Sequence, residues 1–411
     1  MGKKPFWVTV LVAISLTISL FWWTPFASAF TEDEKILLQA WRIVNQSYLD
    51  ESFNHQNWWL MRQKFLQQHP ADKEQTYEAI EEMLASLDDP YTRLLRPEQY
   101  RSLKVSTSGE LSGVGLQISI NSETGQLEVV APLAGSPAEA AGIAPLDHIL
   151  EIDGISTEQL TLDEAAAKMR GPVGTTVSLV VQPQGKNTLR TIELVRDRIS
   201  LNPVYAQLDT TETMPIGYLR LTQFSANAAE EVAHAVAKLE KQGADAYILD
   251  LRNNPGGLLQ AGIEIARLWL DTGTIVYTVN RQGMLGSFES TGPAITQDPL
   301  IVLVNQGTAS ASEILAGALQ DNGRALLVGE KTFGKGLIQS LFELPDGAGI
   351  AVTVAKYETP DHKDINKLGI VPNQIVSQEP ISLRQIATEA DLQYQEAIHL
   401  LTANSVLANA A

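Results

Sequence analysis

The sequence predicts a mixed α/β protein made of three successive regions. Helical periodicity dominates residues 30–103, short strand-like runs separated by glycines fill residues 104–198, and apolar strands alternate with helices over residues 199–411. At 411 residues, with 44% hydrophobic and 19% charged residues, the chain is long enough for two or three domains, each with its own core. We therefore expect three folded regions.

Residues 1–29 have a different character from the rest of the chain. Lys3 and Lys4 precede an apolar run over residues 6–23, and small residues follow at positions 27–29 (Ala-Ser-Ala). This order is typical of a secretory signal peptide. An uncleaved membrane anchor is the alternative, because the run has about the length of a membrane span. In either case we expect the folded part to begin near Phe30 and to lie outside the cytoplasm.

Charge and composition exclude several functions. The whole chain has a net charge of −18, and without residues 1–29 it has 28 basic against 48 acidic residues, a net charge of −20. A surface this acidic repels phosphate backbones, so we expect no nucleic-acid partner. The absence of cysteine excludes disulfides, thiol nucleophiles and zinc–thiolate sites, and no pattern predicts a cofactor or metal.

The N-terminal region predicts a small helical unit. The segment TEDEKILLQAWRIVNQSYLD has an acidic first turn and helical spacing of apolar residues. A second helical pattern, AIEEMLASLDDPYTRLL, ends near Asp89 and Pro90. Trp41, Trp58 and Trp59 are expected in the core of this unit.

The middle and C-terminal regions predict different strand arrangements. In residues 104–198, three strand-like runs (SGVGLQISI, GQLEVVAPL and TTVSLVVQPQ) are interrupted by two short helical segments. From residue 199 the runs IGYLRL, AYILDLR, PLIVLVN and ALLVGE are separated by helical segments, and a further helix is expected near the C-terminus. Such alternation predicts a largely parallel sheet in this C-terminal region.

Two strand ends of the C-terminal region carry residues suited to chemistry. AYILDLR is followed by residues 253–257 (Asn-Asn-Pro-Gly-Gly), and PLIVLVN is followed by Gly307-Thr308-Ala309-Ser310. Glycine amides can approach a substrate closely, and a serine at a helix N-terminus lies where the helix dipole favours negative charge. Simpler interpretations remain: the glycines make a tight turn, and Ser310 to Glu313 form a capping box.

A serine nucleophile requires a base. None of the six histidines lies in a glycine-rich strand-end segment, although a Ser-His-Asp triad is not excluded by sequence. Lys335, in TFGKG, is the alternative, and it would need a lowered pKa to act as a base. The segment GEKTFGK also fits a nucleotide-binding G-x-x-x-x-G-K pattern, but Gly336 stands where that loop needs Ser or Thr.

These segments together resemble the C-terminal processing (tail-specific) serine peptidases. The residues that carry the resemblance are LVNQGTASASEILAGALQD, TFGKGLIQ, DLRNNPGGLL, IGYLRL and DINKLGIVPN. The resemblance covers essentially the whole chain after residue 29 and implies Ser310 as nucleophile with Lys335 as general base. The other residues that it implies are Gln339 to position the lysine, Asp321 in a charge-relay role, the amides of Gly256 (or Gly257) and Ala311 as oxyanion hole, and Asp250, Arg252 and Glu313 in support.

The middle region resembles a PDZ domain. SGVGLQI is similar to its carboxylate-binding loop and strand, and SPAEAAGI with DHILEIDG is similar to the second half of that fold, except that Pro145 and Leu146 replace the usual glycine-containing turn. A PDZ domain captures a peptide's terminal carboxylate and adds the peptide as a strand. The resemblance implies that residues Gly113, Val114, Gly115 and Leu116 bind the peptide C-terminus.

The N-terminal segments narrow the resemblance within the family. AWRIVNQSYLDESFNHQNWW and LDDPYTRLLRPEQYRSLKVSTSGELSGVGLQI are similar to the branch found in oxygenic phototrophs. That branch trims the C-terminal extension of the photosystem II reaction-centre precursor. The resemblance thus implies a protein substrate with a free C-terminus, membrane proximity through that substrate, and location in the thylakoid lumen or periplasm. A general periplasmic tail-specific protease and an inactive PDZ-based binding protein are the alternatives.

Overall fold

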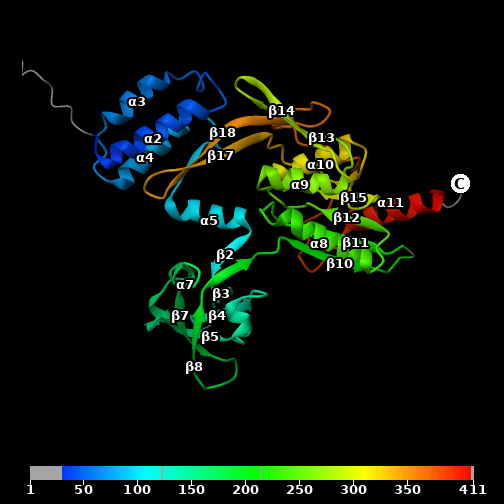
Figure 1. The fold of residues 1–411 in the computed structure, drawn as a ribbon, viewed down its shortest axis with the longest axis horizontal. Helices are drawn as coiled ribbons and strands as arrows, with labels where there is room; N and C mark the ends of the chain where they lie inside the picture. The colour runs from blue at the N-terminus through cyan, green and yellow to red at the C-terminus, as the bar shows by residue number, and fades with distance from the viewer. Residues whose placement is uncertain (1–29, 122–123, 213, 409–411) are drawn as a thin grey trace, which may run out of the picture.

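The structure, a computed structural model, describes residues 30–121, 124–212 and 214–408 (Figure 1). The segment 1–29, which carries the signal-peptide pattern, lies outside the described residues. Within the described ranges, no helix combines the length and apolar character needed to cross a membrane.

The C-terminal region is built on a six-stranded sheet in the order β10-β11-β12-β15-β16-β19. All neighbouring strands are parallel except β10, which runs antiparallel to β11. The sequence prediction of a largely parallel sheet is therefore confirmed. The strands are β10 (Val204–Asp209), β11 (Ile216–Leu221), β12 (Ala246–Asp250), β15 (Leu300–Val304), β16 (Leu326–Gly329) and β19 (Gln374–Ile375).

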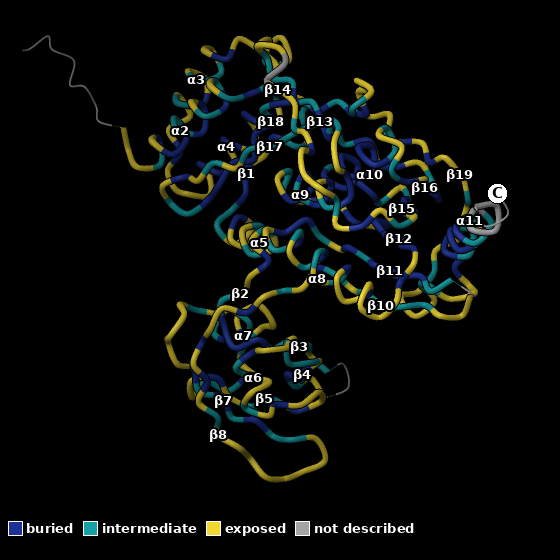
Figure 2. Tube along the Cα trace, turned by 45° about the vertical axis from the view of Figure 1, so that its right-hand side comes forward, coloured by how far each residue is buried: buried dark blue, intermediate teal, exposed yellow. Residues whose placement is uncertain are grey.

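Helices cover both faces of this sheet because its central strands are apolar on both sides. All residues of β12 and β15 are buried (Figure 2). Leu249 packs in the cluster formed with the first set of helices, whereas its neighbour Ile248 packs against the C-terminal helix. The first face carries α8 (Ala228–Lys241), α9 (Leu259–Trp269) and α10 (Ala311–Asp321), and the second carries α11 (Leu392–Ala408).

A second, antiparallel sheet joins the N-terminal helices to the C-terminal region. Its strands are β1 (Arg93–Leu95), β13 (Gly273–Asn280), β14 (Gly283–Ser290), β17 (Leu337–Glu343) and β18 (Gly349–Glu358). Helices α2 (Glu32–Ser47), α3 (Trp58–Leu66) and α4 (Lys73–Ala85) pack on this sheet. Their core includes Ile350 and Val352 of β18, so the helices share a hydrophobic core with strands that follow them by more than 250 residues.

One expectation for the helical region is wrong. Trp41 and Trp58 are buried and exchange hydrogen bonds from each indole to the other's main-chain oxygen, but Trp59 is 60% exposed. Consecutive residues of a helix point about 100° apart, and in α3 the buried side is the one that carries Trp58 and Phe65, so Trp59 falls on the exposed side. Trp59 instead lies on the surface, against Trp41 and beneath Arg62.

The middle region is a separate lobe, connected through α5 (Pro97–Ser108) and an antiparallel pair of β2 and β9 (Figure 1). Its sheet has the order β3-β4-β5-β7-β8, with β6 beside β5, so β3 is an edge strand. Its own apolar cluster contains Val129, Ile149 and Leu179. The elements are β2 (Glu110–Gly113), β3 (Leu116–Ile120), β4 (Leu127–Pro132), α6 (Pro137–Ala140), β5 (His148–Ile152), β6 (Ile155–Ser156), η1 (Thr157–Gln159), α7 (Leu162–Met169), β7 (Thr176–Gln182), β8 (Arg190–Val195) and β9 (Asp197–Ser200).

Candidate active site

Ser310 lies in a strained turn between β15 and α10. The strand ends at Val304, the chain turns through residues 305–309, and Ser310 is the N-cap of α10 with φ 56° and ψ −117°. A non-glycine residue at such angles costs about 1–3 kcal/mol and persists only where its surroundings hold it. Because the strained position is at a helix N-terminus, the serine hydroxyl is presented where main-chain N–H groups point.

The surroundings that hold this turn converge on Glu313, which is fully buried. Its carboxylate accepts hydrogen bonds from the main-chain N–H of Ser310 (2.9 Å), Gly334 (2.7 Å) and Lys335 (2.9 Å), and from the Thr332 hydroxyl (2.5 Å). The Glu313 N–H donates to the main-chain oxygen of Ser310 at 2.8 Å. One side chain therefore ties the Ser310 turn to the segment that carries Lys335, and its role in the expected capping box is only part of its contacts.

Ser310 and Lys335 open onto the same cavity, of about 490 Å³. Gly256, Gly257, Ala311 and Gln339 also line it, so the structure brings together the expected nucleophile, base and amide groups. The rest of the lining is mostly apolar and comes from α9, α10, β17 and the N-terminal region. Such a lining excludes water and strengthens electrostatic interactions inside the cavity.

The environment of Lys335 favours its neutral form. Burial lowers the pKa of the Lys335 ammonium, and the positive charge of Arg93 lowers it further, whereas Asp89 and Glu313 act in the opposite direction. Lys335 Nζ lies 4.8 Å from the centre of the Tyr91 ring. Within the described residues no direct hydrogen bond joins Lys335 to Ser310, although both line the cavity.

Gln339 is held in the wall of the same cavity by the antiparallel sheet. It lies on β17 opposite Thr353 of β18, next to an irregularity in the register, and its Nε2 donates to Thr353 Oγ1 at 3.3 Å. The side chain lines the cavity. Its amide is therefore anchored in the wall of the cavity that Lys335 also lines.

The glycine turn after β12 differs in detail from the expected oxyanion hole. The Gly256 N–H donates to Asn254 Oδ1 at 2.9 Å, so this amide is engaged by the turn itself. Across the described ranges, no hydrogen bond uses the N–H of Gly257 or of Ala311. A Cβ on Gly256 would lie 2.9 Å from the Ala311 nitrogen, so only glycine allows the turn to approach the α10 N-terminus this closely.

Asn254 and Ser312 join this turn to α10. Asn254 is fully buried; its Nδ2 donates to the Leu221 main-chain oxygen at 2.8 Å. The main-chain oxygen of Asn254 accepts hydrogen bonds from the Ser312 hydroxyl (2.9 Å) and the Ala309 N–H (3.0 Å). The second serine of the Ser-Ala-Ser sequence is therefore a buried structural contact.

Asp321 does not reach the cavity. It is the last residue of α10, and eleven helical residues span about 16 Å, so it lies at the opposite end of the helix from Ser310. Its carboxylate pairs with Lys363 Nζ at 2.9 Å and accepts the Asp361 N–H at 3.2 Å. Direct proton relay to Ser310 or Lys335 is incompatible with this position.

Asp250 and Arg252 also lie outside the cavity, on the α11 side of the sheet. Arg252 bonds Asp250 (2.6 and 2.9 Å) and Asp391 (2.7 and 2.8 Å), and the Tyr218 hydroxyl donates to Asp250 at 2.7 Å. All of these carboxylates are buried. Their support is therefore structural: they fasten the end of β12, and with it the start of the glycine turn, to α11.

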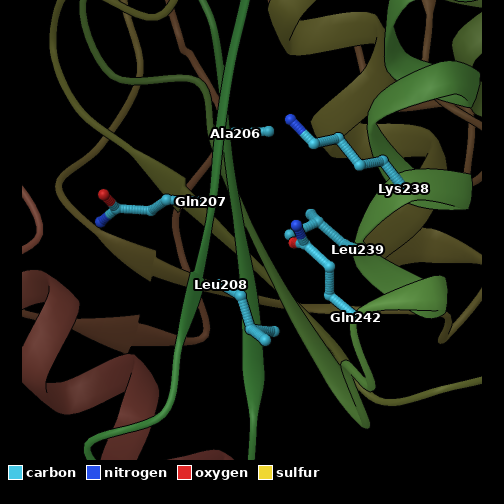
Figure 3. Close-up of a pocket in the computed structure, with 6 residues that line it drawn as sticks. All are labelled: Ala206, Gln207, Leu208, Lys238, Leu239 and Gln242. Carbon is cyan, nitrogen blue, oxygen red and sulfur yellow. The ribbon is translucent and has the colours of Figure 1, made fainter.

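Neither a histidine nor a metal-binding cluster accompanies Ser310 within the described residues. None of the six histidines lines the Ser310 cavity, which removes a Ser-His-Asp triad. No cluster of three or more histidine, aspartate or glutamate side chains in these ranges could hold a metal ion. A separate hollow between β10 and α8 (Figure 3) is lined by Gln207, Lys238 and Gln242 with apolar neighbours, and contains no serine.

In the middle lobe, the segment expected to bind a peptide terminus lines a groove between β3 and α7. Residues Gly113, Val114, Gly115 and Leu116 form part of its wall, and Leu162, Met169 and Arg170 lie among the residues of the other wall. Gly115 has φ 78°, and a Cβ there would lie 2.2 Å from Ser136 Cβ. Because β3 is a sheet edge, its outer side is open to an added strand.

Tyr91 and Arg93 line the Ser310 cavity from the N-terminal region, and neither was predicted from sequence. They follow the Asp89-Pro90 turn, in which the Asp89 carboxylate accepts the Tyr91 N–H (3.0 Å) and the Thr92 hydroxyl (2.7 Å). The only signal was the helix end at this Asp-Pro pair, which indicates a turn but not a partner 220 residues away.

The fold and this geometry define a serine peptidase. The model of peptidase family S41 matches residues 215–376, and the PDZ domain model matches residues 102–182. The chain belongs to peptidase family S41 and is a serine peptidase of the carboxyl-terminal-processing type.

Similar proteins agree on this type. The chain is 67% identical to the carboxyl-terminal-processing protease of Picosynechococcus sp. over 93% of this chain and 92% of the relative. It is 64% identical to the carboxyl-terminal-processing protease of Synechocystis sp., over 100% and 96% of the two chains. A solved structure, the photosystem II D1 C-terminal processing protease, is 39% identical with a TM-score of 0.56, over 88% of this chain and 99% of that one.

Proposed function

We propose that Ser310 and Lys335 are the catalytic pair of this peptidase. The observation that carries the proposal is their shared, largely apolar cavity, in which Ser310 is strained at a helix N-terminus and the pKa of Lys335 is lowered by burial. Neutral Lys335 takes the proton of the Ser310 hydroxyl as the oxygen attacks the scissile carbonyl carbon. The resulting ammonium returns the proton to the leaving amine, and the same lysine then activates water for deacylation.

The oxyanion of the tetrahedral intermediate is assigned to the N–H groups of Ala311 and Gly257. Both are without a hydrogen-bond acceptor among the described residues, and both line the cavity. The Gly256 N–H is committed to Asn254, so the contribution of Gly256 is the close approach of its backbone. Preorganised amides of this kind are each worth about 3–4 kcal/mol of transition-state stabilisation. Gln339, anchored on Thr353, is assigned to positioning the lysine.

The substrate we propose is a protein with a free C-terminus, and in particular the C-terminal extension of the photosystem II D1 precursor. The similarity to a D1 C-terminal processing protease and to cyanobacterial carboxyl-terminal-processing proteases supports this substrate. The groove at Gly113 to Leu116 binds the terminus by adding the peptide to β3. The proposed substrate and the leader-like sequence of residues 1–29 support a location in the thylakoid lumen or periplasm.

Lys335→Arg provides the test of the mechanism. Guanidinium cannot give up its proton in a protein, so Lys335→Arg is expected to be as inactive as Lys335→Ala and Ser310→Ala on a D1 precursor C-terminal peptide, with cleavage mapped by mass spectrometry. Circular dichroism controls for folding. Near-wild-type turnover by folded Lys335→Arg would refute the serine–lysine pair, whereas absence of cleavage of this peptide by the wild-type enzyme would refute the substrate.

A further inference from the structure

Arg93 is an arginine without an acidic partner at the edge of the catalytic cavity. It is the first residue of β1 and lies opposite Ala351 of β18, another residue of the cavity lining. Its side chain is exposed, and within the described residues no carboxylate lies within 4.0 Å of it. An unpaired guanidinium facing a substrate cavity is available to bind a ligand group.

The cavity lining contains two charged side chains, Lys335 and Arg93, and both are basic. This is unusual in a chain with a net charge of −18. The nearby carboxylates are already engaged: Glu313 accepts four hydrogen bonds from the two loops, and Asp89 accepts those of Tyr91 and Thr92. The charge that faces the substrate is therefore positive.

Lys335 and Arg93 have different roles in this cavity. Lys335 must be neutral to act on Ser310, and the adjacent guanidinium contributes to its lowered pKa. A guanidinium offers a planar set of positively charged N–H donors that matches a carboxylate. The group at this site that is suited to bind a carboxylate is therefore Arg93.

We propose that Arg93 is a specificity residue that binds a carboxylate of the substrate near the scissile bond. The carboxylate is either an acidic side chain of the peptide or the terminal carboxylate of a short C-terminal extension. This inference rests on the proposed function of the Ser310 cavity but adds a recognition element from the N-terminal region. It is separate from the groove at residues 113–116, which lies in the middle lobe.

The anchoring of β1 makes this recognition rigid. Thr92, next to Arg93, is buried; its hydroxyl donates to Asp89 and accepts the Thr353 N–H at 3.0 Å. Thr353 Oγ1 in turn accepts the Gln339 amide. These contacts fix the backbone next to Arg93 relative to Gln339 in the cavity wall. Substitution of the Arg93 side chain leaves these contacts in place.

The test uses the full chain and a peptide that spans the cleavage site in five forms. Three forms carry Glu, Gln or Lys at one position near the scissile bond with an amidated terminus. Two carry Gln at that position with a free or an amidated terminus on a short extension. We compare kcat/KM ratios for wild type, Arg93→Gln and Arg93→Glu at the plateau of each pH profile, with exposed Arg101→Gln on α5 as matched control.

We expect wild type and Arg101→Gln to prefer the carboxylate form of one pair about ten-fold, as for a partly exposed charged hydrogen bond. Arg93→Gln should abolish that preference, and Arg93→Glu should instead prefer a Lys-containing peptide. The pair that responds identifies the source of the carboxylate. An unchanged preference in Arg93→Gln, or no reversal in Arg93→Glu, would overturn the proposal.

A binding measurement separates this inference from the proposed mechanism. Dissociation constants of the same peptides are measured on Ser310→Ala and on Ser310→Ala/Arg93→Gln, in which turnover is not required. A carboxylate preference that is present in the first and lost in the second supports Arg93 even if the wild-type enzyme cleaves none of the peptides. Equal affinities in both proteins would refute Arg93 recognition even if the serine–lysine mechanism holds.

Discussion

Replacing Glu313 with glutamine is expected to disconnect the Ser310 turn from the Lys335 segment. The carboxylate accepts two hydrogen bonds on each oxygen: Thr332 and Gly334 on Oε1, and Ser310 and Lys335 on Oε2. A glutamine side chain has one acceptor oxygen and one NH2 donor. In either orientation, its NH2 group therefore faces at least one main-chain N–H that also donates.

The size of the effect follows from these contacts. Glutamine loses two accepted hydrogen bonds, each worth about 1.5–3 kcal/mol when the acceptor is charged, and leaves buried N–H groups without partners. Because Glu313 is fully buried, water cannot replace the lost acceptor. We expect Glu313→Gln to lower the free energy of unfolding by about 3–6 kcal/mol. We also expect it to reduce kcat at least a hundred-fold, because the segments that carry Ser310 and Lys335 are no longer held together.

Urea denaturation and peptide turnover measure the two effects. Thr332→Val is the comparison that keeps the carboxylate. It removes one of the four donors to Glu313 and also the acceptor of the Ile370 N–H, so it should cost about 2–4 kcal/mol and retain more activity than Glu313→Gln. Residual activity of Glu313→Gln is measured where the variant is still folded by circular dichroism. Wild-type stability and turnover in Glu313→Gln would refute the conclusion that this side chain joins the two loops.

Three further predictions follow from the described contacts. The pKa of Lys335 is lowered in the folded enzyme, so activity should rise with pH through an apparent pKa below the ordinary 10.5. The folded protein also releases this proton at a lower pH than the unfolded chain does, so the free energy of unfolding should rise with pH in that window. Urea denaturation measures this rise, and Lys335→Met should flatten it. Ser312→Ala should lose about 1 kcal/mol of stability, through the hydrogen bond to Asn254, and keep much of its activity; an inactive but folded variant would contradict a purely structural role. Amidating the C-terminus of a long substrate peptide should raise KM with little change in kcat, because the groove at residues 113–116 loses a charged ligand, and equal KM for acid and amide would argue against carboxylate capture there.

Much of the fold could be predicted from local patterns. The alternation of apolar runs and helical segments after residue 199 predicted β11, β12, β15 and β16 with their intervening helices, because side-chain periodicity is a local property of the chain. Ser310 and the glycine turn were predicted to lie at strand ends from the same periodicity. They were expected to lie close together because the carboxyl ends of the strands of a parallel sheet meet at one edge.

What local patterns could not supply is the direction in which individual side chains point. Asp250 ends the strand that precedes the glycine turn and Arg252 lies just after it, yet the two form a buried cluster with Asp391 near α11 and do not line the cavity. Asp321 follows Ser310 along one helix but lies at its far end, paired with Lys363. Proximity in sequence was therefore misleading about proximity in the site.

The sequence by itself predicted the main strands and helices, the position of Ser310 between a strand and a helix, and a base that was either a lysine or a histidine. The family resemblance already implied Lys335; only the tertiary structure shows that TFGKG lies beside α10 through the contacts of Glu313 and that no histidine lines the cavity. It also placed Tyr91 and Arg93 in the catalytic cavity. The physical reason is that periodicity and turn chemistry act over a few residues, whereas the pairing of β1 with β18 depends on the packing of the N-terminal helices against a sheet formed some 250 residues later.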